Sequence, residues 1–175
     1  MCLTLAGISI LKGFSMPHLI SQFLPDLATL LPVTDEFLCS ANLTLHEAVC
    51  QVTLLGSRGL AGGYQPESDI DLSLMVDVKQ LPTFEPERAG LLRDVLEMTL
   101  SQWRGAVDVD LAVVFDRGDC CGMRCFHERS WNDSIIAGRG EDCFGIYKIQ
   151  RGFNGYVTEG VRLAPMYPML VIWRR

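Results

Sequence analysis

One stretch of nine residues restricts the fold of this chain more than any other. From Asp69 to Asp77 every second residue is a branched aliphatic, and the residues between them are mostly acidic or polar. Successive side chains of a β-strand point to opposite faces, so this alternation predicts a strand with one face on a hydrophobic core. The aliphatic face consists of Ile70, Leu72, Leu74 and Val76, and the opposite face carries Asp69, Asp71, Ser73, Met75 and Asp77.

The segment before this strand predicts a second strand and a sharp turn. Gln51 to Leu55 is a short β-favouring run that stops at Gly56 and Ser57. The next eleven residues, 58–68, contain three further glycines and a proline, which are typical of a turn-rich loop. The order is therefore strand, Gly-Ser turn, loop and strand.

The remaining hydrophobic patterns predict helices that alternate with further strands. We expect one α/β (α+β) domain, with a mixed central sheet and helices packed on it, over residues 16–175. Residues 1–15 are expected to be an N-terminal extension with little structure. The expected helices are His18–Leu31, Thr34–Cys50 with Thr34 as N-cap, Glu87–Trp103 and a short one near 124–136, and the further strands are Val107–Phe115, Phe144–Ile149 and Tyr167–Trp173.

Size, charge and cysteine content limit the classes of function. The chain has 175 residues, 49% of them hydrophobic, which suits one domain with a full core. Its net charge of -6 makes long DNA or RNA an unlikely substrate. Seven cysteines without disulfide spacing predict reduced thiols and a cytoplasmic protein. No run of eighteen apolar residues occurs, so we expect no membrane contact.

The residues around the Gly-Ser turn are suited to holding a phosphate and a metal ion. A turn at Gly56 lets backbone N–H groups approach an anion, and the Ser57 hydroxyl adds a donor. Asp69 and Asp71 emerge on the same strand face, roughly 6–7 Å apart by strand geometry. Carboxylates at that spacing can hold a hard cation, for which magnesium on phosphate oxygens is the natural candidate.

A third carboxylate on a neighbouring strand would complete a site for two magnesium ions. Asp110 and Asp108 lie on the same face of the strand Val107–Phe115, so parity does not choose between them. Asp110 is preferred because Asp110-Leu111 begins the most apolar part of that strand, as Asp71-Leu72 does. If the three carboxylates cluster, their repulsion should raise the pKa of at least one in the metal-free protein.

The segment GSRGLAGGYQPESDIDL resembles the nucleotidyltransferase superfamily that includes DNA polymerase beta, and especially its minimal members. The resemblance covers about residues 45–115 and implies a nucleotidyltransferase fold. It further implies that Gly56 and Ser57 bind a nucleoside triphosphate, expected to be ATP. Asp69 and Asp71 would hold metal, and Asp110 (with Asp108 as the alternative) would complete the ligands and activate the acceptor hydroxyl. Minimal members often act with a helical partner, so a protein partner or protein acceptor is expected.

Several alternatives stay open at the level of sequence. A catalytically silent nucleotide-binding or interaction module would carry the same motif, and an aspartate-bearing strand face could also protect a sheet edge from pairing. Arg58 is either a phosphate ligand or a surface arginine beside an acidic loop. A zinc site is less expected than free thiols for the group Cys120, Cys121, Cys125, His127 and Cys143, because it contains no clean Cys-x-x-Cys pair.

Overall fold

The computed structural model describes residues 17–24, 26–116, 144–148, 155–157 and 169–175. Three expectations therefore lie outside the described residues: the N-terminal extension 1–15, the short helix near 124–136, and the cysteine group from Cys120 to Cys143. Within the part described, no helix combines the length and the hydropathy needed to cross a bilayer.

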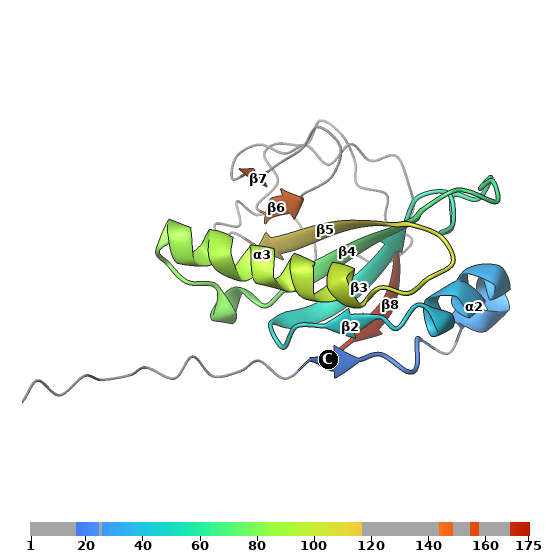
Figure 1. Ribbon diagram of the computed structural model, residues 1–175, viewed down its shortest axis with the longest axis horizontal. Coiled ribbons are helices and arrows are strands. Elements are labelled where there is room, and N and C mark those ends of the chain that lie inside the picture. The colour runs from blue at the N-terminus through green and yellow to red at the C-terminus, as the bar shows by residue number, and fades with distance from the viewer. Residues whose placement is uncertain (1–16, 25, 117–143, 149–154, 158–168) are drawn as a thin grey trace, which may run out of the picture.

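A six-stranded mixed sheet forms the centre of the fold (Figure 1). The strand order is β7-β6-β5-β4-β3-β8; β4 and β5 are parallel, and every other neighbouring pair is antiparallel. The sheet strands are β3 (Val49–Leu55), β4 (Ile70–Val76), β5 (Val109–Asp116), β6 (Phe144–Lys148), β7 (Gly155–Val157) and β8 (Leu170–Arg174). The mixed α/β architecture expected from the sequence is thus confirmed.

The long helix α3 (Glu85–Gln102) crosses one face of this sheet and connects the two parallel strands (Figure 1). Parallel neighbours need such a crossover, because a tight hairpin can join only antiparallel strands. The helix begins after Phe84, with Pro86 in its first turn, where a missing N–H costs no hydrogen bond. A short 3-10 helix, η1 (Val78–Gln80), precedes it.

The main hydrophobic core lies between α3 and the sheet. Leu92, Val95 and Leu96 of the helix are each at most 1% exposed, and they repeat at the spacing of one helix face. They belong to one cluster with the aliphatic face of β4, as the alternation predicted. A smaller cluster of Met75, Val114 and Met169 lies on the other face of the sheet. Asp71 lies one residue before Leu72 and four before Met75, so its side chain is on the face that α3 does not cover.

The expected helix His18–Leu31 is wrong for most of its length. Instead, β1 (His18–Leu19) pairs with β2 (Thr44–Leu45), and among the described residues of this segment only α1 (Leu27–Leu30) is helical. Backbone hydrogen bonds go to distant segments in place of a helix: Ile20 N–H donates to the Leu43 carbonyl and Leu24 N–H to the Ile172 carbonyl, both at 2.9 Å. These tertiary partners outweigh the local helical spacing of the leucines.

The second expected helix is also shorter than predicted. α2 spans Pro32–Ser40, so it begins before Thr34 and ends well before Cys50. Thr34 is not the N-cap, because its hydroxyl donates to the Arg58 carbonyl at 2.8 Å. Beyond the helix, Asn42 has a positive φ of 59°, a left-handed conformation that turns the chain toward β2.

Candidate functional site

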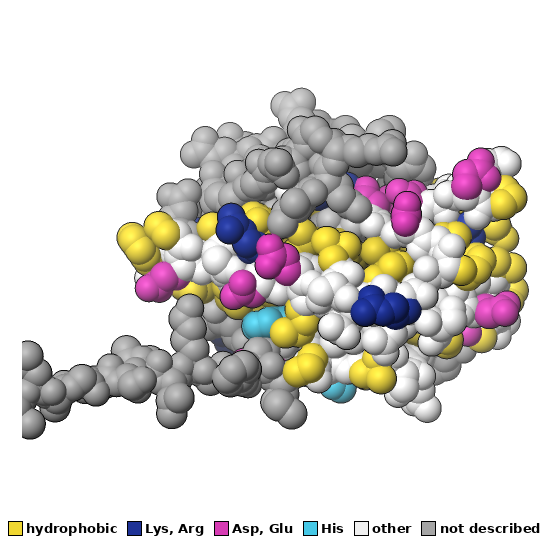
Figure 2. Space-filling view, viewed as in Figure 1, with side chains coloured by type: hydrophobic (Ala, Val, Ile, Leu, Met, Phe, Trp, Pro, Cys, Tyr) yellow, Lys and Arg dark blue, Asp and Glu magenta, His cyan; other side chains and the backbone are white. Residues whose placement is uncertain are grey.

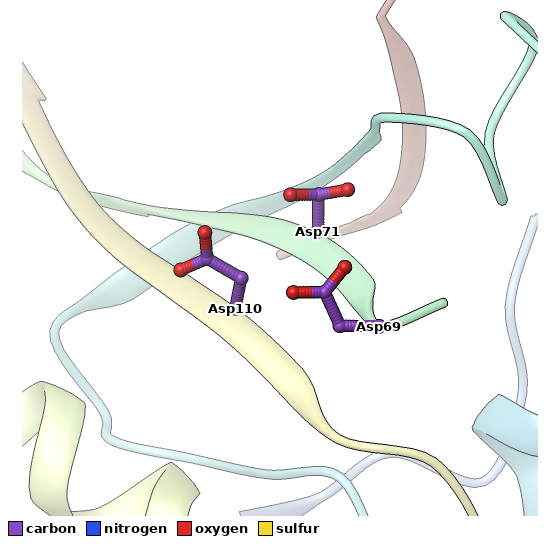
Figure 3. Close-up of side chains that lie close together, drawn as sticks. All are labelled: Asp69, Asp71 and Asp110. Atoms are coloured by element: carbon purple, nitrogen blue, oxygen red, sulfur yellow. The ribbon is translucent and has the colours of Figure 1, made fainter. Parts of the chain in front are cut away.

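Three carboxylates meet on the sheet face opposite α3, at the end where β4 and β5 begin. Asp71 on β4 is the register partner of Asp110 on β5, and Asp69 lies directly before β4. One oxygen from each of Asp69, Asp71 and Asp110 lies within 4.8 Å of the others. Figure 3 shows the three side chains turned toward a common space between the two strands.

The geometry distinguishes Asp110 from Asp108. Among the described residues, the acidic cluster contains Asp110 and does not contain Asp108. Asp108 lies before the first residue of β5, and its side chain is exposed. Its backbone carbonyl instead accepts a hydrogen bond from the Ile70 N–H at 2.9 Å, which fixes the start of the parallel pair. Asp108 therefore supports the site through its backbone.

The cluster perturbs the ionisation of its central member. The pKa of Asp71 is raised from 3.8 to about 6, first because the carboxyl is partly buried and second because Asp69 and Asp110 are also anionic. Lys148 partly offsets this rise. The expectation that at least one clustered carboxyl has a raised pKa is confirmed at Asp71.

A lysine that the motif did not reveal contacts the cluster. The Lys148 ammonium, from β6, forms an ion pair with Oδ2 of Asp110. The other oxygen of that carboxylate, Oδ1, is buried without a hydrogen-bond partner among the described residues. Sequence reasoning missed Lys148 because it lies 38 residues beyond Asp110 and carries no motif. The only available signal was its place at the end of a β-favouring run.

The Gly-Ser turn packs directly against the acidic cluster. Gly56 is buried and has a positive φ of 66°. It comes directly after Leu55, which is the register partner of Asp71 on β4. The turn closes with a hydrogen bond from Gly59 N–H to the Gly56 carbonyl at 3.1 Å. Ser57 is half-buried at this turn, and within the described residues its hydroxyl has no hydrogen-bond partner.

Arg58 is buried, so its interpretation as a surface arginine is wrong. The residue is only 1% exposed. Its guanidinium donates to the carbonyls of Ser68 at 2.6 Å and Pro66 at 2.7 Å. It also lies 4.9 Å from the ring centroid of Phe37 and 4.8 Å from that of Tyr64. Arg58 thus fixes the loop that connects the Gly-Ser turn to the aspartates. Its role as a phosphate ligand stays a prediction.

Acidic side chains gather at the cluster, and a groove lies elsewhere on the described part of the protein. Figure 2 shows acidic side chains gathered at the end of the sheet where β4 and β5 begin. A groove of about 690 Å³ lies between β1, β2 and α3, and Thr44, Asp94 and Glu97 are among its lining residues. None of the three clustered aspartates lines it, so it offers no support to this site.

The donor set of the cluster fits a hard divalent cation. Three carboxylates supply only oxygen ligands, which magnesium prefers and which zinc uses less often than nitrogen or sulfur. The buried Oδ1 of Asp110, which has no hydrogen-bond partner in the described part of the chain, is an acceptor that a cation would satisfy. Comparisons of the chain with protein-family models, curated proteins and solved structures found no significant match.

Proposed function

We propose that the chain is a magnesium-dependent nucleotidyltransferase that transfers a nucleoside monophosphate from a triphosphate, with ATP as the expected donor, to a hydroxyl acceptor. One observation carries the proposal: carboxylates from two parallel strands converge within 4.8 Å of one another. The Gly56 turn packs against one of these carboxylates, that of Asp71. Both parts of the motif are therefore neighbours in space as well as in sequence.

Asp69, Asp71 and Asp110 would hold magnesium. The ions, when bound, supply charge neutralisation for the phosphates and make the acceptor hydroxyl more acidic. Asp110 would accept the proton of that hydroxyl, and an Oδ1 without a hydrogen-bond partner among the described residues supports this role. Holding the reacting groups beside one another is the main contribution of such a site, because phosphoryl chemistry depends on positioning and electrostatics.

The Gly56-Ser57 turn would bind the triphosphate. Its Ser57 hydroxyl can donate to a phosphate oxygen, and backbone N–H groups in a turn with a left-handed residue form an anion-binding concavity. Arg58 would act indirectly by fixing the loop 58–68, as its hydrogen bonds to Ser68 and Pro66 indicate. We extend the proposal to a nucleotidyltransferase fold and to a protein partner or protein acceptor.

Two measurements test the proposed function. Magnesium together with ATP should raise the melting temperature of the full chain, because a ligand that binds only the folded state stabilises it. Asp69→Asn combined with Asp71→Asn should abolish this rise. Incubation with α-labelled ATP, magnesium and a cell extract should then transfer label to an acceptor with the wild-type chain and not with the double variant.

A matched control separates loss of the site from loss of charge. Glu87→Gln removes a carboxylate from the exposed surface of α3, on the far face of the sheet, and should leave both results unchanged. Binding without transfer to any acceptor would instead favour the silent nucleotide-binding module. The absence of any thermal shift with the wild-type chain would contradict both functions.

A further inference from the structure

Lys148 lies on the same sheet face as the three carboxylates for a clear geometric reason. Its neighbour Tyr147 is the register partner of Val113, and the Tyr147 hydroxyl accepts a hydrogen bond from Arg93 of α3. Tyr147 therefore points toward the helix. Because side chains alternate along a strand, Lys148 points away from the helix and reaches Asp110.

The two carboxylate oxygens of Asp110 have different environments. Oδ2 is held by the Lys148 ammonium, and Oδ1 is buried without a partner among the described residues. A buried carboxylate oxygen without a partner is costly, so this arrangement is stable only if something compensates for it. The nearby ammonium supplies part of that compensation, since it also counters the repulsion that Asp71 experiences from Asp69 and Asp110.

We infer that Lys148 is the internal counter-ion of the acidic cluster: it holds Asp110 in the metal-free protein and moves to a triphosphate oxygen when metal and nucleotide bind together. This inference rests on the proposed function and adds a residue and an order of events to it. Lysine suits the task because its ammonium is a compact charge on a flexible four-carbon stem. Lys148 is 28% exposed, which leaves its head group access to a ligand.

The inference has a definite electrostatic consequence. An ammonium on Asp110 competes with a metal ion for the same carboxylate and repels it. Without nucleotide, Lys148→Met should therefore bind manganese(II) about tenfold more tightly than the wild type. The repulsion between a unit positive charge and a dication about 5 Å away is large enough for this change even at the dielectric constant of water. A bound triphosphate gives the wild-type lysine a new anionic partner. Metal and nucleotide should then favour one another's binding, and this coupling should be weaker in Lys148→Met.

The test measures metal binding and does not depend on catalysis. Metal-free full-length chain is titrated with manganese(II) alone and again with a non-hydrolysable α,β-methylene analogue of ATP, and the free ion is followed by electron paramagnetic resonance. Lys148→Arg, which keeps the charge, should stay within about threefold of the wild type. Lys79→Met removes an exposed lysine from η1 and should change nothing.

The possible outcomes separate this inference from the proposed function. If the wild type binds manganese(II) and Lys148→Met binds it equally or more weakly, the counter-ion role is overturned and the metal site stands. If the metal affinity rises in Lys148→Met but the coupling to the analogue is unchanged, the transfer of Lys148 to phosphate is overturned. If neither protein binds the ion, both the inference and the metal-dependent function fail.

A second measurement uses only the wild-type chain, so it does not depend on a variant that folds. Reductive methylation of lysines, followed by mass spectrometry, reports how accessible each amine is. Manganese(II) alone should increase the labelling rate of Lys148 several-fold by releasing it from Asp110, and adding the triphosphate analogue should reduce it again. Lys79 should be labelled at a constant rate. A Lys148 rate that is indifferent to the metal contradicts the inference.

Discussion

Gly56 and Asp71 are in such close contact that no side chain fits between them. A Cβ built on Gly56 would lie 1.7 Å from Oδ2 of Asp71, a distance shorter than any non-bonded contact. Gly56 also has a φ of 66°, which side chains other than glycine rarely adopt. The turn and the acidic cluster are therefore packed against each other, and a side chain at Gly56 should displace the Asp71 carboxylate.

Gly56→Ala should destabilise the protein by about 2–4 kcal/mol, because backbone strain adds to the clash with Asp71. The measurement is urea unfolding followed by circular dichroism. Gly62→Ala is the matched control, since Gly62 also has a positive φ, at 70°, but has open space where a Cβ would lie. It should cost only about 1 kcal/mol. Equal losses in the two variants would show that the contact with Asp71 has no energetic effect.

The metal-free protein should lose stability as the pH rises from about 4 to 6. The pKa of Asp71 in the folded protein, about 6, is above its ordinary value of 3.8. The folded state therefore binds a proton more tightly than the unfolded state, and the stabilisation present below about pH 4 disappears as pH passes 6. The full shift corresponds to about 3 kcal/mol, which solvent screening of this partly exposed group reduces to roughly 1–2 kcal/mol.

Asp71→Asn tests that pH dependence directly. Urea unfolding in a chelating buffer should show the variant to be more stable than the wild type at pH 7.5 and the difference to shrink near pH 4. The same substitution at the exposed Asp108 should leave the pH dependence as it is in the wild type. A wild-type protein that is equally stable at both pH values would refute the repulsive cluster.

Arg58→Lys should be nearly as damaging as Arg58→Met. Lysine keeps the charge but cannot reproduce a planar fork that donates to three backbone carbonyls while it packs on the rings of Phe37 and Tyr64. We expect a loss of about 2–4 kcal/mol from either change, measured by urea unfolding. Arg104→Lys, at an exposed arginine, should stay within about 0.5 kcal/mol. If Arg58→Lys caused only a small loss of stability, the positive charge alone would account for the contribution of Arg58 to the fold.

Asp110→Asn should weaken manganese(II) binding by at least about tenfold, since affinity follows the number of charged ligands. Asp108→Asn should leave the affinity within about twofold, because the exposed Asp108 acts through its backbone carbonyl. Calorimetric titration of the two variants compares them directly. The reverse order would assign the third ligand to Asp108 and would contradict the arrangement in Figure 3.

The elements that flank the site were predictable because their signals are contiguous. Alternation from Asp69 to Asp77 depends on the two-residue period of a strand, and it matches β4 to within a residue at each end. The strand before Gly56 and the helix Glu85–Gln102 each begin two residues earlier than β-favouring residues and helical spacing predicted, and both end within one residue of the predicted position. The prediction that Asp69 and Asp71 lie on the same strand face required only this local geometry.

The tertiary structure was needed to show which residues from distant segments of the chain come together. The sequence alone determined that two aspartates share a strand face beside a Gly-Ser turn. Only the folded chain decided that Asp110 joins them, that Lys148 pairs with Asp110, that Arg58 is buried, and that residues 18–24 are not helical. The physical reason is that register, burial and ion pairing depend on contacts whose free energy exists only after distant segments have packed together.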